Sequence, residues 1–258
     1  MRIVAVVLGG GVGQRLGAGM PKQLLTLGGR TLIEWCVAAF EAAPGVDEIL
    51  VVMAAGYTGQ VRELLAGYGK VTAVIEGGTT RPESTRAALA AIAAGGSAAD
   101  GGSIAGGGSV AAGGSVTAGG SVAAGGADCG VLLHDAARPL VDQRIIADCV
   151  AALAAHDAAG VAVPASDTMV ITENGVMHSV PPRERLFRCQ TPQCFRLPVI
   201  VRAHELAAAD PEFAPTDDCG VVLRYLPGTA VHIVPGSERN MKVTYPHDLA
   251  VAAALLEE

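Results

Sequence analysis

The stretch MRIVAVVLGGGVGQRLGAGMPKQ, residues 1–23, decides the fold of this chain of 258 residues. Its first part, from Arg2 to Leu8, predicts a strand, and the unbroken apolar run from Ile3 to Leu8 is typical of a strand buried on both faces of a parallel sheet. Glycines follow this run directly, and a polar segment follows the glycines. A buried strand that ends in such a turn predicts an α/β fold whose ligand lies beyond the carboxyl end of the strand.

The rest of the chain alternates predicted strands with predicted helices. We predict strands at 48–53, 71–75, 130–134, 160–164 and 230–234, and helices at 31–43, 58–66, 82–94, 142–155 and 246–256. Such alternation indicates a Rossmann-like, mostly parallel sheet with helices on both faces. Half of the residues are hydrophobic but only 3% are aromatic, as expected for buried parallel strands under small-residue helices. We therefore expect residues 1–258 to form a single α/β domain.

Two segments depart from this alternation. From about 168 to 190 the helical period is absent, and VITENGV at 170–176 carries Asn-Gly between apolar residues, which predicts a β-hairpin arm leaving the sheet. From about 95 to 127 the chain is almost only Gly, Ala and Ser, with an apolar residue at every sixth position from Ile104 to Val122. A six-residue period also occurs in β-helices, but one apolar residue per rung buries too little surface. We expect a flexible surface insertion.

Charge and cysteine content exclude several classes of function. The formal net charge of -7 argues against a nucleic-acid surface, which needs a basic face. The apolar start has no basic leader and no membrane-length run, and the six cysteines form no CxxC pair. We therefore expect a cytoplasmic protein with reduced thiols that binds neither nucleic acid nor membrane, and that captures any anionic ligand with a local group of cations.

Glycine-rich or polar motifs follow four of the predicted strands. These motifs are GGGVG at 9–13, Gly77-Gly78, His134-Asp135 and Ser166-Asp167-Thr168. Because the carboxyl ends of parallel strands meet at one edge of a sheet, the four motifs are expected to converge there. The first motif matches neither a Walker loop nor a dinucleotide fingerprint, since Pro21 precedes Lys22 and Leu16 stands three residues after Gly13. On its own it fits a tight turn as well as a phosphate-binding loop.

Charged residues near these motifs have both functional and structural interpretations. Asp135 could hold Mg²⁺ against a triphosphate and Arg138 could bind a second phosphate, although a salt-bridged turn is the alternative. His134 is expected to be a hydrogen-bonded packing residue and not a base. Lys242 lies in a polar loop before the last helix, where a solvated lysine is the simpler interpretation. Thr216-Asp217-Asp218 is a predicted helix N-cap.

Several motifs occur in one order along nearly the whole chain. They are GGGVGQRLGAGMPKQ at 9–23, GGTTRPES at 77–84, HDAARP at 134–139, SDTM at 166–169, TPQCFR at 191–196, TDD at 216–218 and NMKVTYPHDL at 240–249. Together they resemble the 2-C-methyl-D-erythritol 4-phosphate cytidylyltransferases of the non-mevalonate isoprenoid pathway. Three positions depart from the usual pattern of that family: Gly9 and Gly10 replace alanines, and Thr79 replaces an aspartate beside the base pocket.

The resemblance implies a nucleotidyltransferase fold and a reaction that joins CTP to 2-C-methyl-D-erythritol 4-phosphate and releases pyrophosphate. It implies a homodimer in which the arm of one subunit carries Arg183 into the site of the other, and Mg²⁺ as cofactor. The roles it implies are catalysis by Arg15, Lys22 and Lys242, metal binding by Asp135, nucleotide binding by Gly9, Gly10, Gly11, Gly13, Gly77, Gly78 and Ser84, and acceptor binding by Arg138, Thr168, Arg183 and Lys242.

Three other functions stay open from the sequence. A ribitol 5-phosphate cytidylyltransferase has similar motifs, although Ala137 and the pair Asp217-Asp218 favour the methylerythritol acceptor. A noncatalytic nucleotide-sensing module could keep the glycine loop, but it would not need Arg15 and Lys22. A nicotinamide-dependent dehydrogenase is disfavoured because the dinucleotide fingerprint is absent.

Overall fold

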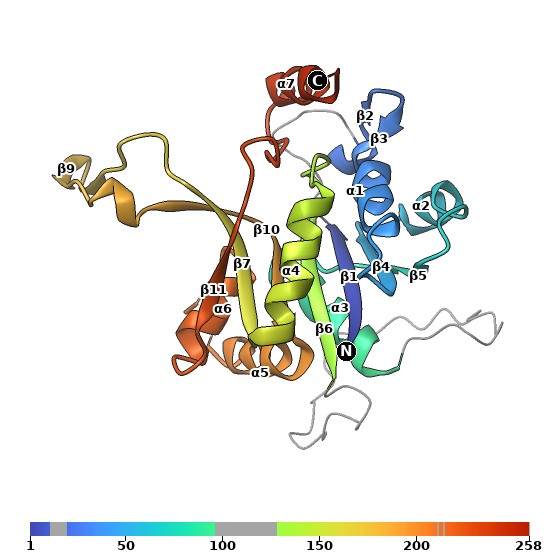
Figure 1. Cartoon of the computed structure of the whole chain (residues 1–258), viewed down its shortest axis with the longest axis horizontal. Coiled ribbons are helices and arrows are strands. Elements are labelled where there is room, and N and C mark those ends of the chain that lie inside the picture. Colours follow the sequence, from blue (N-terminus) through green and yellow to red (C-terminus); the bar gives the residue numbers. More distant parts are fainter. Residues whose placement is uncertain (11–19, 96–127, 211, 214, 258) are drawn as a thin grey trace.

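One large sheet forms the centre of the computed structural model, which describes residues 1–10, 20–95, 128–210, 212–213 and 215–257 (Figure 1). Its strand order is β11-β7-β10-β6-β1-β4-β5. The strands are β1 (Arg2–Gly9), β4 (Glu48–Met53), β5 (Val71–Glu76), β6 (Cys129–Asp135), β7 (Ala158–Pro164), β10 (Phe187–Arg196) and β11 (Val231–Pro235). All are parallel except β10, which is antiparallel to both of its neighbours. The predicted mostly parallel α/β sheet is confirmed.

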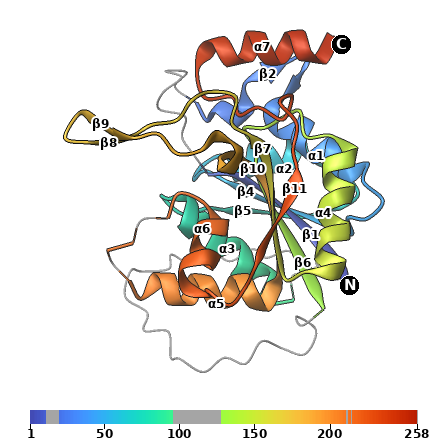
Figure 2. The same ribbon diagram turned by 60° about the vertical axis from the view of Figure 1, so that its left-hand side comes forward.

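Helices cover both faces of the sheet, as predicted (Figure 2). One face carries α1 (Leu32–Glu41), α2 (Thr58–Leu64) and α4 (Gln143–Ala155), and the other carries α3 (Arg81–Ala93), α5 (Leu197–Ala208) and α6 (Asp218–Tyr225). The last helix, α7 (Pro246–Glu257), packs beside the small hairpin of β2 (Thr26–Leu27) and β3 (Arg30–Thr31). It therefore lies above the carboxyl edge of the sheet, away from both faces.

The apolar run of β1 is unbroken because both faces of this strand are buried. Ile3, Ala5 and Val7 pack into the cluster that α1, α2 and α4 share with the sheet. The alternate residues from Val4 to Leu8 pack into the cluster under α3, α5 and α6. Period-two alternation of side chains thus supplies apolar contacts to two layers of helices at once.

Polar caps set where the helices begin. Thr31 and Thr80 each form a capping box with the glutamate three residues later, at the starts of α1 and α3. Asp142 and Asp217 cap α4 and α6, and Asp217 Oδ1 accepts the backbone N–H of Gly220 at 2.9 Å. The predicted cap at 216–218 is therefore confirmed.

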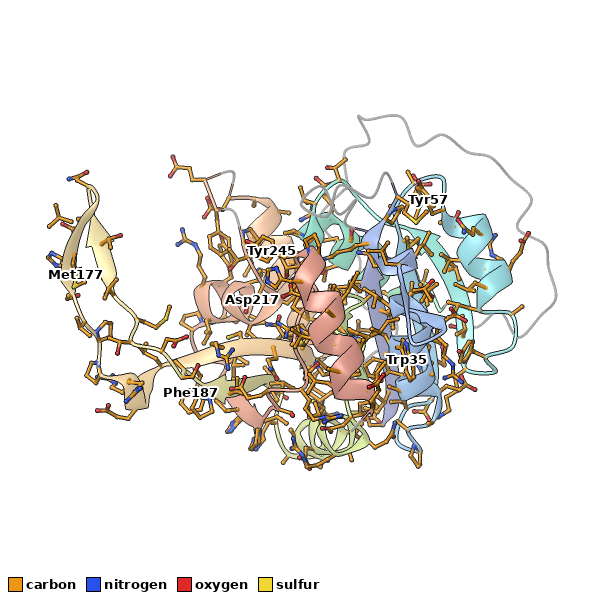
Figure 3. All side chains as sticks on the ribbon, turned by 90° about the horizontal axis from the view of Figure 1, so that it is seen from above. Trp35, Tyr57, Met177, Phe187, Asp217 and Tyr245 are labelled. Carbon is orange, nitrogen blue, oxygen red and sulfur yellow. The ribbon has the colours of Figure 1, made fainter. Side chains whose placement is uncertain are left out.

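The predicted hairpin is present and projects from the sheet (Figure 1). It consists of β8 (Ile171–Glu173) and β9 (Val176–Ser179), whose residues are all exposed. The turn residues Asn174 and Gly175 have φ values of 49° and 77°, the left-handed conformation that an Asn-Gly turn adopts. Figure 3 shows Met177 at the far end of this arm, well away from Asp217 and Tyr245. The chain rejoins the main sheet where β10 begins, a few residues before the end of the predicted arm range.

The structure bears on two further features, the Gly-, Ala- and Ser-rich insertion and membrane-spanning helices, only through the residues it describes. Apart from Gly95, the predicted Gly-, Ala- and Ser-rich insertion lies outside the described residues. Its two attachment points follow the end of α3 and precede the start of β6, at the sheet edge opposite the carboxyl ends of the strands. Within the described ranges, no helix is long and apolar enough to cross a membrane.

Candidate functional site

A cavity of about 850 Å³ opens at the carboxyl edge of the sheet. Its walls come from the segments that follow β1, β4, β5 and β6, and from the loops that hold Lys22 and Lys242. This volume is within the range of ordinary small-molecule sites. Motifs that are far apart in the sequence therefore meet around one cavity, as their positions after parallel strands predict.

Most of the predicted site residues that the structure describes line this cavity. They are Gly10, Lys22, Gly77, Gly78, Ser84, Asp135 and Lys242. Gly9 is buried at the end of β1 behind them. Gly11, Gly13 and Arg15 lie outside the described residues.

Main-chain contacts bring the two lysines together from opposite ends of the chain. Lys22 begins the short 3-10 helix η2 (Lys22–Leu24), and its Nζ donates a hydrogen bond to the carbonyl oxygen of Val243 at 2.8 Å. The N–H of Val243 donates to the carbonyl oxygen of Ala137 at 2.8 Å. The fully buried Val243 side chain packs under α7 with Leu27. A small apolar cluster therefore fixes the loop that carries Lys242.

Asp135 ends β6 and forms the acidic centre of the site. Its Oδ2 accepts a hydrogen bond from Lys242 Nζ at 2.7 Å, and its Oδ1 lies 3.3 Å from Nε of Arg81. Burial opposes ionisation of this carboxyl group, but the positive charges of Arg81 and Lys242 outweigh it and hold the pKa of Asp135 well below its ordinary value. Asp135 is therefore a fixed negative charge at the cavity wall.

His134 is a packing residue, as predicted, and its hydrogen bonds define its tautomer. Its Nε2 lies 3.1 Å from the carbonyl oxygen of Arg138, which can only accept, so Nε2 carries the hydrogen. Its Nδ1 then accepts from the hydroxyl of Thr191 at 3.0 Å, and that hydroxyl accepts the N–H of Asp135 at 3.1 Å. Burial lowers the pKa of His134 to about 4, so the ring is neutral at neutral pH.

Polar residues in the middle of β10 hold the loops around the cavity. Gln193 accepts the N–H of Asp218 at 2.8 Å through Oε1 and donates to Asp217 Oδ2 at 2.8 Å through Nε2. Asn240 Nδ2 donates to the carbonyl oxygen of Thr191, also in β10, at 2.8 Å. These contacts explain why the TPQ, TDD and NMK motifs occur together, since one antiparallel strand anchors the other two segments.

Close packing accounts for the two glycines that follow β5. A Cβ built on Gly77 would lie 2.6 Å from Oγ of Ser84 and 2.8 Å from Cγ1 of Val52. A Cβ on Gly78 would lie 2.1 Å from Cβ of Glu83. The cavity wall thus needs glycine at both positions for lack of space.

Three predicted acceptor-binding residues do not line the cavity. Arg138 lies beside it, where Nη1 donates to the carbonyl oxygen of Asn240 at 2.8 Å and Nη2 to that of Cys189 at 3.3 Å. Thr168 and Arg183 are exposed at the base of the arm. The site of one chain therefore contains neither of these two arm residues.

Sequence reasoning missed Arg81, which lines the cavity between Asp135 and Asp218. Its Nη1 lies 2.6 Å from Oδ2 of Asp218, and Oδ1 of Asp218 lies 3.0 Å from Nε2 of His204. One signal could have found it. Arg81 is the first residue of α3, where the helix dipole disfavours a cation unless carboxylates lie close by.

The described part of the cavity wall carries equal numbers of positive and negative side chains, whereas a group of cations was expected. Its described charged residues are Lys22, Arg81 and Lys242 against Glu76, Glu83 and Asp135. Asp135 pairs with two of these cations, Arg81 and Lys242, so local charge pairing opposes a net positive surface. The predicted cation Arg15 lies outside the described residues.

Asp135 suits a metal that draws most of its ligands from a substrate. Among the described residues, no group of three or more His, Cys, Asp or Glu side chains could hold a metal ion. Mg²⁺ commonly binds one or two carboxylates and completes its shell with water and substrate phosphates. An ionised carboxylate at the cavity wall fits that mode of binding.

A mostly parallel α/β sheet with lysines and a carboxylate around a cavity at its carboxyl edge is the arrangement of a nucleotidyltransferase. The chain belongs to the family described as IspD, 2-C-methyl-D-erythritol 4-phosphate cytidylyltransferase, whose family model matches residues 3–99 and 102–258.

Curated relatives and a solved structure agree with this assignment. The 2-C-methyl-D-erythritol 4-phosphate cytidylyltransferase of Thermobifida fusca is 47% identical over 262 residues, covering 99% of this chain and 93% of the relative. The bifunctional ribulose 5-phosphate reductase/CDP-ribitol pyrophosphorylase Bcs1 of Haemophilus influenzae is 31% identical, covering 98% of this chain but 48% of the relative. The crystal structure of 2-C-methyl-D-erythritol 4-phosphate cytidylyltransferase from Thermus thermophilus has a TM-score of 0.68 and 29% identity, with 98% of each chain covered.

Proposed function

We propose that this protein transfers the cytidylyl group of CTP to 2-C-methyl-D-erythritol 4-phosphate, giving 4-diphosphocytidyl-2-C-methyl-D-erythritol and pyrophosphate in the non-mevalonate isoprenoid pathway. The observation that carries the proposal is the meeting of Lys22, Lys242 and Asp135 at one cavity. The methylerythritol acceptor is favoured because the relative named for it is 47% identical, against 31% for the relative named for CDP-ribitol.

The reaction is an in-line attack of the acceptor phosphate on the α-phosphorus of CTP, with pyrophosphate leaving. An ionised phosphate is already a nucleophile and needs no general base, which agrees with the neutral, buried ring of His134. Lys22 and Lys242, with Arg15, stabilise the negative charge of the transition state. The ammonium groups of Lys22 and Lys242 are held by hydrogen bonds before substrate binds, so little reorganisation is needed when the charge develops.

Mg²⁺ is part of this proposal, with Asp135 as its protein ligand. The bound ion would neutralise triphosphate charge and polarise the phosphoryl group that is attacked. Asp135 supports this role because it is charged and faces the cavity.

The nucleotide contacts are proposed from the lining of the cavity. Gly10, Gly77, Gly78 and Ser84 would border the cytidine, and Gly9, Gly11 and Gly13 would complete the loop beside the phosphates. Thr79 is not proposed as a side-chain contact to the base. Its N–H and its hydroxyl both donate to Glu83 Oε2 at 2.7 Å.

The acceptor site is proposed to need a second subunit. Arg138 and Lys242 would bind the acceptor from one chain, and Thr168 and Arg183 would take part through exchange of arms in a homodimer. The exposed apolar side chains on the arm support this, since Val176 is 69% and Met177 63% exposed in the single chain. A cytoplasmic location is also proposed and is supported by the six unpaired cysteines.

Pyrophosphate release from CTP tests the proposal. The purified protein is supplied with CTP, Mg²⁺ and either 2-C-methyl-D-erythritol 4-phosphate or ribitol 5-phosphate, and the Lys22→Ala protein controls for contaminating activity. Release that depends on the methylerythritol acceptor supports the proposal. A preference for ribitol 5-phosphate would overturn the acceptor, and no release with either acceptor would overturn the activity.

A further inference from the structure

A continuous row of paired polar and charged side chains leads from the cavity into the layer of α3, α5 and α6, and its far members Asp218 and His204 are buried. It runs from Lys242 through Asp135 and Arg81 to Asp218 and ends at His204. Successive nitrogen-to-oxygen distances are 2.7, 3.3, 2.6 and 3.0 Å. Lys242 and Asp135 belong to the proposed reaction, but the far end of this row has no role in it so far.

Asp218 is the anchor of this row. It is 1% exposed, and its backbone N–H donates to Gln193 Oε1 at 2.8 Å. It also lies in the first turn of α6, where the helix dipole favours a negative charge. These contacts fix Asp218 independently of Arg81.

His204 fixes the other oxygen of Asp218. The ring is 2% exposed on α5, and a carboxylate only accepts hydrogen bonds, so Nε2 must donate to Oδ1. Oδ2 is therefore left facing Arg81. His204 thus determines which way the carboxylate of Asp218 points.

Arg81 depends on these two residues for its place in the cavity. As the first residue of α3 it lies at the positive end of the helix dipole, which opposes a cation there. Its Nε lies 3.3 Å from Oδ1 of Asp135, and its Nη1 lies 2.6 Å from Oδ2 of Asp218. If Asp218 lost its charge, the side chain could turn to solvent, and Asp135 would lose one of its two cationic partners.

We propose that Asp218 and His204 are positioning residues, which hold the guanidinium of Arg81 against Asp135 and so keep that carboxylate oriented toward the bound nucleotide. The role of Asp135 in binding Mg²⁺ and CTP rests on the proposed function. The positioning itself rests on the contacts among Asp135, Arg81, Asp218 and His204.

The first test compares Asp218→Asn with Asp217→Asn. Both changes remove one negative charge from the same motif, but Asp217 caps α6 and contacts Gln193 without touching Arg81. Binding of CTP with Mg²⁺ is measured by calorimetry in the absence of acceptor. Steady-state kinetics give kcat, the KM of each substrate and the Mg²⁺ concentration for half-maximal activity. Urea unfolding measures the stability of each variant. Asp218→Asn is expected to weaken Mg²⁺-dependent CTP binding and lower kcat by about 10- to 100-fold, with KM for the acceptor nearly unchanged. Asp217→Asn is expected to leave binding and kcat within about twofold.

The second test uses substitutions of His204 and a conservative rescue. His204→Gln keeps a donor for Asp218 and is expected to retain near-normal CTP binding, whereas His204→Leu is expected to behave as a weaker form of Asp218→Asn. Equal effects of the two His204 variants, or loss of folding stability with normal CTP binding in Asp218→Asn, would overturn the proposal. Calorimetry needs no turnover, so the two proposals are tested separately. Absence of pyrophosphate release by the wild-type protein would refute the proposed function. The comparison of CTP binding among the variants would still test the positioning role.

Discussion

The ammonium group of Lys242 lies 2.7 Å from Oδ2 of Asp135, although the two residues are 107 positions apart in the chain. This ion pair joins the last loop of the protein to the end of β6. Lys22 joins the same loop through the carbonyl oxygen of Val243. The cations of the cavity are therefore placed by contacts within the protein before any substrate binds.

Lys22→Ala is expected to lower kcat by about a hundredfold, because one cation lost from a preorganised site raises the barrier by about 3 kcal/mol. The measurement is pyrophosphate release at saturating CTP and acceptor. The chain has three lysines, and Lys70→Ala is the matched control. Lys70 Nζ donates a hydrogen bond to the carbonyl oxygen of Ala43, and neither residue lines the cavity. Near-normal turnover by Lys22→Ala would contradict the assignment.

His134 is expected to make the folded state less stable in mild acid. Its pKa is lowered from 6.5 to about 4 in the folded protein, so between these values the unfolded chain binds more protons. Stability is therefore full above pH 6.5 and decreases as the pH falls toward 4. The loss from this residue between about pH 7.5 and 5 is roughly 2 kcal/mol.

Urea unfolding at a series of pH values measures this effect. Carboxylates such as Asp135, whose folded pKa is depressed, lose their contribution only at lower pH, because their ordinary values lie near 4. The His134→Gln protein should accordingly show a flatter dependence between about pH 7.5 and 5. Parallel curves for the two proteins would refute this account.

Gly77→Ala is expected to destabilise the fold by about 1 to 3 kcal/mol, because its Cβ would overlap Ser84 and Val52. Gly59→Ala, in α2 with open space around it, is the control and should stabilise by up to about 1 kcal/mol. Denaturant midpoints of the two variants give the comparison. A Gly77→Ala protein as stable as the parent would show that the wall of the cavity adjusts.

Mixing two inactive variants tests the exchange of arms. If Arg183 of one subunit serves the site of the other, a dimer of Lys22→Ala with Arg183→Ala chains has one intact site and one doubly impaired site. Random reassociation of equal amounts should then restore about a quarter of wild-type activity, since half of the dimers are mixed. Mixtures no more active than their components would exclude shared sites.

Most of the sheet could be predicted, because buried parallel strands are apolar on both faces and alternate with helices. The strand β10 was missed as part of the main sheet. Its central residues Gln190, Thr191 and Gln193 are polar yet buried, so hydrophobicity does not mark them. Their burial depends on partners that are distant in sequence, such as His134 in β6 and Ser237 after β11.

The candidate site was predictable only in part, for a similar reason. Lys22, Asp135 and Lys242 stand in motifs whose order along the chain is informative. Asp218 fits the acidic first turn of a capped helix so well that local sequence gives no sign of its ion pair with Arg81. The contribution of His204 is equally hidden, because a histidine on a helix has many ordinary roles.

The long connection after α3 departs and returns at the edge of the sheet that faces away from the cavity. Because both attachment points lie at that edge, we expect chain added or removed between Gly95 and Asp128 to leave the lysines and Asp135 in place. A change of length at this position is therefore expected to leave the rate of catalysis unchanged. The same position would accept a fluorescent reporter for following the enzyme in living cells.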